Sequence, residues 1–248
     1  MSVPRFYCDA SLPETGDYRL PDGVLHHATR VLRMHEGDAM VLFDGQGGEV
    51  PATLERNQGQ WFARLGVRRG VARESPLEVV LVQALASGDK MDWIVQKAVE
   101  LGACGVLPVR AERSVVRLDA DRALKRVGHW RQVAIAACEQ SGRDRVPWIA
   151  PVRDLSAVLR EEVCPAIDAT GAGAWVLDPA STTRLADEAP PPGRIHLLIG
   201  PEGGWSETEL AACRTAGCRG LRLGPRILRT ETAGLVAIAA VQARWGDI

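Results

Sequence analysis

Two patterns of hydrophobic and polar positions divide the chain. Over the first seventy or so residues the apolar runs are short and turn residues interrupt them. Asp44-Gly45 and Gly47-Gly48 fall between two β-type runs, AMVLFDGQGGEVPATLE, which predicts a hairpin or a slightly longer loop. Before them, LHHATRVLRM carries its apolar residues on one side and predicts one helix. We therefore expect a small, mostly β domain with one helix, most simply a compact barrel.

Beyond residue 73 the pattern alternates between strand and helix. The polar segment GVARESP closes with Ser-Pro and predicts a domain boundary there, which gives domains over residues 1–73 and 74–248. The second domain is expected to be α/β with a mainly parallel sheet. Its expected strands are LEVVLVQAL, GVLPV, AWVL and IHLLIG, and its expected helices are MDWIVQKAVELG, LKRVGHWRQVAIAACEQ and TELAACRTAG.

Composition places the chain among ordinary globular proteins, with 46 % hydrophobic and 25 % charged residues. No run approaches the length of a membrane-spanning helix, and the N-terminus lacks the pattern of a signal peptide. The six cysteines are scattered and form no C-x-x-C pair, so we expect a reduced, cytoplasmic protein. The pair His26-His27 has no further ligands at zinc spacing, and no metal is expected.

The charge permits RNA binding without requiring it. A net charge of −1 argues against a protein that coats nucleic acid by bulk electrostatics. Between Arg110 and Arg145, however, nine Lys/Arg stand against five Asp/Glu. Nearly all the basic residues are arginine, which suits bidentate contacts to phosphate and base edges. A GC-rich genome would favour arginine codons equally well.

A glycine-rich loop is the strongest local signal in the second domain. The apolar run Ile195–Ile199 leads into Gly200–Gly204, and a helix follows whose start carries the S-x-x-E capping box of Ser206 and Glu209. Glycines allow a close approach of backbone to a ligand, and open α/β sheets bind ligands at the carboxyl ends of their strands. Taken alone, the pattern is explained at least as well by a tight structural turn.

A second loop lies close to the C-terminus. A strand is expected at Leu221–Leu223, then a loop through Gly224-Pro225, then a helix that runs to about Trp245. Because that helix is apolar on every face from Ala233 to Val241, we expect it to be enclosed in a core or between subunits. Thr230 and Glu231 at its start have local explanations as cap and dipole partner, whereas Arg229 has none.

The two motifs together resemble a known family. IGPEGG followed by LGPRILRTETA resembles the C-terminal motifs of SPOUT-class RNA methyltransferases, and more narrowly those of the RsmE family, which methylates N3 of a uridine in 16S rRNA. HHATRVLRMHEGD and LFDGQGGEV resemble the PUA-like barrel of that family. KMDWIVQKAVELG, AERSV and AIAACEQSGRDRVP resemble its central motifs, so the likeness covers the whole chain.

The resemblance implies a fold, a cofactor and partners. It implies a PUA-like β-barrel at residues 1–73 and a SPOUT domain at 74–248, with a trefoil knot over about 195–245. It also implies a homodimer that acts on 16S rRNA within the small ribosomal subunit, and no association with a membrane. One departure is Asp178-Pro179, where relatives often carry His-Pro. The cofactor would be S-adenosylmethionine, held by Leu198, Ile199, Gly200, Glu202, Gly203, Gly204, Leu223, Gly224, Ile227, Leu228 and Thr230.

The implied reaction needs a base and a group that stabilises charge. The N3 proton of uracil must leave before the nitrogen can attack the methyl group, and negative charge develops on the uracil oxygens. Arg229 is the candidate for stabilising that charge, and Glu139 and Glu231 are the candidate bases. Either glutamate is equally explained as the ion-pair partner of an arginine.

RNA contacts are expected from both domains. His27, Arg30 and Arg33 recur every three residues and predict a phosphate-binding row on one helix face, although an ordinary solvated face explains them too. Around the long helix, the candidates are Arg110, Arg113, Arg143 and Arg145. Two rival functions remain open at this point: a SPOUT methyltransferase acting on another rRNA or tRNA site, and a non-catalytic RNA-binding protein of ribosome assembly.

Overall fold

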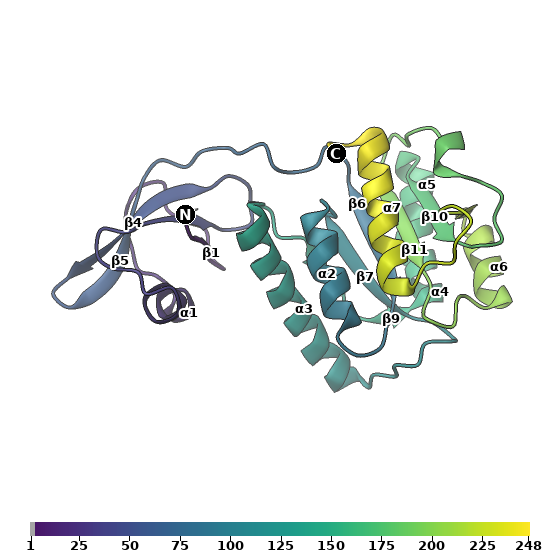
Figure 1. Cartoon of the computed structure of the whole chain (residues 1–248), viewed down its shortest axis with the longest axis horizontal. Helices are drawn as coiled ribbons and strands as arrows, with labels where there is room; N and C mark the ends of the chain where they lie inside the picture. The colour runs from purple at the N-terminus through teal and green to yellow at the C-terminus, as the bar shows by residue number, and fades with distance from the viewer. Residues whose placement is uncertain (1–2) are drawn as a thin grey trace. The chain divides into compact units, whose positions relative to one another are not determined.

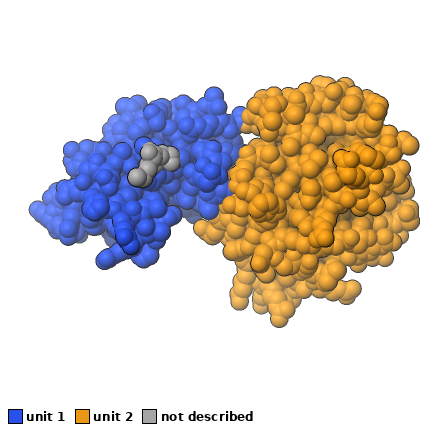
Figure 2. All heavy atoms as spheres, in the orientation of Figure 1, with its two compact units in different colours: residues 1–74, 135–146 blue, residues 75–134, 147–248 orange. Residues whose placement is uncertain are grey.

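The structure is a computed structural model that describes residues 3–248, and the chain forms two compact units (Figure 2). The first unit runs to Glu74 and also includes Ile135–Val146, and the second comprises Ser75–Ala134 and Pro147–Ile248. The segment 135–146 is the difference from the sequence-based division. It contributes to the first unit because the Glu139 carboxylate accepts the Tyr7 backbone N–H at 2.9 Å and the Asp144 carboxylate accepts the Gly48 N–H at 2.6 Å.

The first unit is built on a five-stranded sheet in the order β1-β3-β4-β5-β2. β1 and β3 are parallel and the other pairs are antiparallel. One helical segment, α1 (Asp22–His26) continued by the π-helical turn η1 (His27–Val31), covers the core. The expected small, mostly β domain with one helix is therefore confirmed. Its strands are β1 (Arg5–Tyr7), β2 (Gly16–Tyr18), β3 (Ala39–Phe43), β4 (Val50–Asn57) and β5 (Gln60–Leu65).

A buried carboxylate organises the charges of the first unit. Glu49 is 2 % exposed and forms ion pairs with Arg5, Arg69 and Arg73. Burial by itself raises the pKa of Glu49, but the hydrogen bonds from Arg5 and Arg69 outweigh it and the pKa is lowered. The pairing keeps this carboxylate ionised inside the unit, as a buried charge requires.

The second unit is a parallel sheet with helices on both faces (Figure 1). The main order is β12-β10-β11-β6-β7-β8, and β9 also pairs with β7. The α/β class is confirmed. The strands are β6 (Val79–Ala84), β7 (Gly105–Arg110), β8 (Trp148–Ile149), β9 (Arg153–Asp154), β10 (Gly173–Leu177), β11 (Ile195–Ile199) and β12 (Arg219–Leu221). The helices are α2 (Lys90–Glu100), α4 (Leu155–Val158), η2 (Leu159–Val163), α5 (Cys164–Thr170), η3 (Leu185–Asp187), α6 (Glu207–Thr215) and α7 (Thr230–Trp245). The helix α3 (Ala120–Ser141) belongs to this unit as far as Ala134.

Alternate residues of the central strands face different helices. Val80, Val82 and Leu198 pack with α4 and α6 in one core cluster. On the other face Leu81 and Ile199 contact α7 at Gly234, and α7 also packs against α2. Both faces of the sheet are therefore covered, which explains why the strands read as continuous apolar runs.

Two expectations near the C-terminus are modified. The last strand ends at Leu221 rather than Leu223, because the Arg222 N–H bonds to the carbonyl of Thr183 and the chain then turns through Gly224 at φ +77°. Within the chain, α7 is buried on one side only. Ala237, Ile238 and Val241 are buried, whereas Val236 is 40 % exposed.

Among the described residues, no helix is both long and apolar enough to cross a membrane. All six cysteines are free, and no group of three or more His, Cys, Asp or Glu side chains in the described part of the chain is arranged to hold a metal ion.

His196 gives the second unit a specific sensitivity to acid. The side chain lies inside β11 at 2 % exposure, and burial, with a smaller contribution from Arg194, lowers its pKa from 6.5 to about 4. Below pH 6.5 the unfolded chain binds a proton that the folded chain does not. The free energy of unfolding should therefore fall by about 1.4 kcal/mol per pH unit, or about 3 kcal/mol by pH 4. Urea unfolding from pH 7 to pH 4 measures this loss.

The matched variants isolate the histidine from other titrating groups. His196→Leu should show a shallower loss of stability between pH 6.5 and pH 4 than the unaltered protein. His26→Leu, which alters an exposed histidine of the first unit with no ion pair among the described residues, is the matched control. Equal slopes for all three proteins would contradict the assignment.

Candidate functional site

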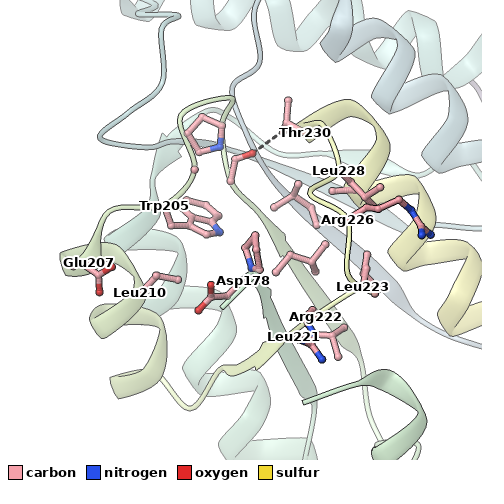
Figure 3. A pocket seen from close by; sticks show the side chains of 18 residues that line it. Asp178, Trp205, Glu207, Leu210, Leu221, Arg222, Leu223, Arg226, Leu228 and Thr230 are labelled. Carbon is pink, nitrogen blue, oxygen red and sulfur yellow. Dashed lines mark hydrogen bonds between the residues drawn. The ribbon is translucent and has the colours of Figure 1, made fainter. Parts of the chain in front are cut away.

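A pocket opens at the carboxyl ends of β10, β11 and β12, where an open parallel sheet offers its ligand site (Figure 3). Its walls come from the three segments that follow these strands and from the starts of α6 and α7. Most of the lining is apolar, and a few charged side chains stand among it. The lining residues are Leu177, Asp178, Pro179, Ile199, Gly200, Pro201, Gly204, Trp205, Glu207, Leu210, Leu221, Arg222, Leu223, Gly224, Arg226, Leu228, Thr230 and Ala233.

A hydroxyl group ties the two C-terminal motifs together. The Thr230 hydroxyl, at the start of α7, donates to the carbonyl of Gly200 at 2.6 Å (Figure 3). The same oxygen accepts a 2.9 Å hydrogen bond from the Gln83 amide, which is fully buried on β6. Three segments that are distant in sequence thus meet at one side chain, and the meeting point is a wall of the pocket.

A charged cluster holds the tip of the glycine-rich loop. The Glu202 carboxylate accepts from the backbone N–H and the hydroxyl of Ser87, at 3.0 and 2.7 Å, and from the Lys90 ammonium at 3.0 Å. The same ammonium lies 3.7 Å from the Glu231 carboxylate. Burial raises the pKa of Glu202, but the donors from Ser87 and Lys90 outweigh it and lower the pKa to about 2.

Further contacts hold the loop from its other side. The Arg113 guanidinium donates to the carbonyls of Gly203 and Trp205, at 3.4 and 3.3 Å. The expected capping box at the start of α6 is confirmed, with Ser206 and Glu209 exchanging both hydrogen bonds. The loop is therefore fixed at both ends before any ligand binds.

Seven of the eleven residues assigned to the cofactor from the sequence line the pocket: Ile199, Gly200, Gly204, Leu223, Gly224, Leu228 and Thr230. Four do not lie in its wall. Leu198 points into the core on the opposite face of the sheet, and Glu202 binds Ser87 and Lys90. Gly203 lies against Arg113, and Ile227 is 83 % exposed.

The sequence did not identify several lining residues, of which Asp178, Trp205, Arg222 and Arg226 are the most informative. Asp178 directly follows β10, which ends at Leu177. The position of Asp178 after a predicted strand was a usable signal, because the carboxyl ends of parallel strands lie at one edge of a sheet, where ligands bind. Only the order of strands, which the sequence does not show, places the end of β10 beside those of β11 and β12.

The three candidate catalytic residues lie in different settings. Arg229 is the N-cap residue of α7 and is exposed beside the pocket residues Leu228 and Thr230. Glu231 lies in the first turn of α7 near Lys90. Glu139 belongs to the first unit, where burial raises the pKa of its carboxyl group despite the hydrogen bond from Tyr7.

Three arginines proposed to bind RNA have partners within the protein, although only Arg143 is buried. The Arg143 guanidinium is buried and pairs with Glu74 at 2.6 Å, Arg113 donates to the glycine-rich loop, and Arg110 pairs with Asp154 at 3.3 Å. Arg145 is exposed.

The phosphate-binding row predicted for His27, Arg30 and Arg33 does not lie on one helix face. Arg30 is exposed and His27 packs edge-on against Phe6. The helix ends at Val31 and Arg33 has a φ of +55°, so Arg33 lies beyond the helix that was expected to carry it.

The comparisons with known proteins agree with this architecture. A family model of an RNA methyltransferase domain matches residues 73–242, and a model of an RNA methyltransferase PUA domain matches residues 20–58. The fold and the family models together define an RNA methyltransferase of the SPOUT class that carries a PUA-like domain.

Individual relatives narrow the class to a family. The Ribosomal RNA small subunit methyltransferase E of Mycobacterium tuberculosis is 37 % identical over 99 % of this chain and 94 % of its own length. That of Bacillus subtilis is 31 % identical over 93 % of this chain and 91 % of its own length. The Neisseria gonorrhoeae enzyme of the same name, solved with bound S-adenosylmethionine, has a TM-score of 0.91 and 38 % identity, with full coverage of both chains. A methyltransferase of Legionella pneumophila, solved with the same cofactor, has a TM-score of 0.91 and 34 % identity, also with full coverage of both chains. The chain belongs to the ribosomal RNA small subunit methyltransferase E family, which confirms the resemblance found in the sequence.

The Thr230 hydroxyl should contribute measurably to stability. Thr230→Val keeps the shape but removes the donor to Gly200 and one acceptor of the buried Gln83 amide. Because an unsatisfied buried polar group is costly, we expect the free energy of unfolding to fall by about 2 kcal/mol. Thr232→Val, at an exposed position two residues along, should change it by less than about 0.5 kcal/mol. Urea unfolding measures both values, and equal effects would show that the hydroxyl link is not stabilising.

Proposed function

We propose that this chain binds S-adenosylmethionine in the pocket at the ends of β10, β11 and β12 and methylates ribosomal RNA of the small subunit. The target is N3 of one uridine in 16S rRNA. The proposal depends chiefly on one observation, that both glycine-containing C-terminal motifs line a single pocket in a chain of the methyltransferase E family. The relatives from Neisseria gonorrhoeae and Legionella pneumophila hold S-adenosylmethionine.

The residues of the pocket fit such a ligand. Apolar side chains such as Leu221, Leu223 and Leu228 offer a surface for the adenosine, and a few polar groups are available to fix its orientation. Gly204 and Gly224 have φ angles of +69° and +77°, which glycine adopts without strain, and both lie in the pocket wall. The absence of side chains there lets the ligand approach the backbone.

Bound S-adenosylmethionine supplies an electrophilic methyl group on a positively charged sulfur. The protein must then remove the uracil N3 proton and stabilise the negative charge on the neighbouring oxygens. Arg229 is positioned for the second task, because it precedes α7 at the pocket and its side chain is exposed. No ion pair of Arg229 is found among the described residues, which leaves the guanidinium available to substrate.

Glu231 is the stronger candidate for the base. Its carboxylate oxygen Oε2 is buried, accepts no hydrogen bond within the described structure and lies 3.7 Å from the Lys90 ammonium. Glu139, in contrast, already accepts the backbone N–H of Tyr7. A base needs a free lone pair directed at the proton that it removes, and Glu231 lies one residue from the pocket residue Thr230.

Four further proposals concern RNA contacts, the homodimer, the knot and the substrate. The first unit, with exposed Arg30 and Arg33, and the exposed Arg145 supply contacts to the RNA backbone. The half-exposed apolar face of α7, which includes Val236, is covered by a second copy in a homodimer. Residues 195–245 form the trefoil knot of the SPOUT class, and the enzyme acts within the small ribosomal subunit.

The function is tested in a strain that lacks the gene. Nucleoside mass spectrometry of its 16S rRNA should show the loss of 3-methyluridine, and the unaltered gene should restore it. Arg229→Ala should restore methylation at a rate lower by at least about tenfold, because charge on the uracil is no longer stabilised. Arg214→Ala, which alters an exposed arginine of α6 outside the pocket lining, should restore it fully. Loss of a different modified nucleoside would point to another RNA site, and no loss would favour a non-catalytic protein.

The two glutamates are separated by their amide variants. Glu231→Gln should lower kcat by at least about tenfold, since the amide cannot accept the N3 proton. Glu139→Gln should retain most of the activity. The assay measures methyl transfer to small subunits that lack the mark, with saturating S-adenosylmethionine. The opposite ranking would move the role of base to Glu139, and two active variants would exclude both.

A further inference from the structure

We propose that Asp178 recognises the positive charge of the cofactor and so favours S-adenosylmethionine over uncharged adenosine compounds. This inference rests on the proposed function, since it concerns the same pocket. Asp178 follows β10 and its side chain lies in the pocket between Trp205 and Leu221 (Figure 3).

Hydrogen bonds hold Asp178 in a fixed position. Its backbone N–H donates to the carbonyl of Leu221 at 3.0 Å, and its own carbonyl accepts the Ser181 N–H at 3.0 Å. Within the side chain, Oδ1 accepts the Ala180 N–H at 2.9 Å. One carboxylate oxygen is thus committed to the turn after β10, and the other is available to a ligand. A group fixed in this way loses little conformational entropy when a ligand binds.

The charge of Asp178 has no counter-ion within the described structure. Arg222 and Arg226 line the same pocket, yet no ion pair joins either to Asp178. The carboxylates of the neighbouring cluster differ, since Glu202 and Glu231 share the Lys90 ammonium. An anionic group in a mainly apolar pocket is poorly compensated, so a ligand that brings a positive charge is favoured there.

S-adenosylmethionine carries two positive charges, on its sulfonium and on its ammonium group. S-adenosylhomocysteine keeps only the ammonium, and 5′-methylthioadenosine has neither. The three compounds share the adenosine that the apolar walls would hold. Their affinities therefore separate the contribution of charge from that of burial.

Asp178→Asn is the decisive variant, because the amide oxygen can still accept the Ala180 N–H while the charge is lost. By isothermal titration calorimetry we expect S-adenosylmethionine to bind about tenfold more weakly to this variant and 5′-methylthioadenosine to bind equally to both proteins. If S-adenosylhomocysteine loses as much affinity as S-adenosylmethionine, Asp178 recognises the ammonium group. If S-adenosylhomocysteine loses no affinity, Asp178 recognises the sulfonium. Either result supports the proposal.

Unchanged affinity for S-adenosylmethionine would overturn the proposal, as would an equal loss for all three compounds, which indicates a structural role. Asp168→Asn is the matched control, because it removes an exposed carboxylate of α5 outside the pocket lining and should alter affinity by less than about twofold. If Asp178→Asn unfolds, Asp178→Ser and the salt dependence of binding to the unaltered protein test the same charge. Failure of the unaltered protein to bind S-adenosylmethionine at all would refute the proposed function instead.

Discussion

The hydrogen-bonded link from Gln83 through Thr230 to Gly200 is the contact on which the candidate site depends. It joins β6, the end of β11 and the first residue of α7 where little solvent reaches, since Gln83 is fully buried and Thr230 is 6 % exposed. Hydrogen bonds in such surroundings are stronger than in water, and leaving one unmade is costly. The link therefore sets where α7 begins, and with it the positions of Arg229 and Glu231.

Much of the fold was predictable because its causes are local or periodic. The parallel strands are covered on both faces and read as apolar runs, and Ser206 and Glu209 specify the start of α6 by themselves. The end of β12 was placed two residues too late, since its limit depends on the distant carbonyl of Thr183. The last turns of α3 looked like any amphipathic helix, and nothing local shows that they pack within the first unit.

The same distinction applies to the site. The glycines of the two C-terminal motifs could be recognised from residue type alone. Most of the glycines that were expected to contact the cofactor line the pocket. Asp178 was noticed only as a departure from its relatives, because its importance comes from strand order. Arg143 illustrates the reverse case: a charge that suggested RNA contact is buried against Glu74. Residue type alone does not distinguish an arginine that holds the protein together from one that meets a ligand.

The carboxylates near the pocket differ in the number of hydrogen-bond donors and cations that surround them. Glu202 accepts three hydrogen bonds, and with a pKa of about 2 it is a poor proton acceptor at neutral pH and serves to fix the loop. Glu231 Oε2 lies 3.7 Å from the Lys90 ammonium and accepts no hydrogen bond among the described residues. Asp178 has one backbone donor and no cationic partner among residues 3–248. Structural support, proton transfer and recognition of positive charge are thus proposed for three acidic side chains of one unit, and the distribution of donors is the reason for each assignment.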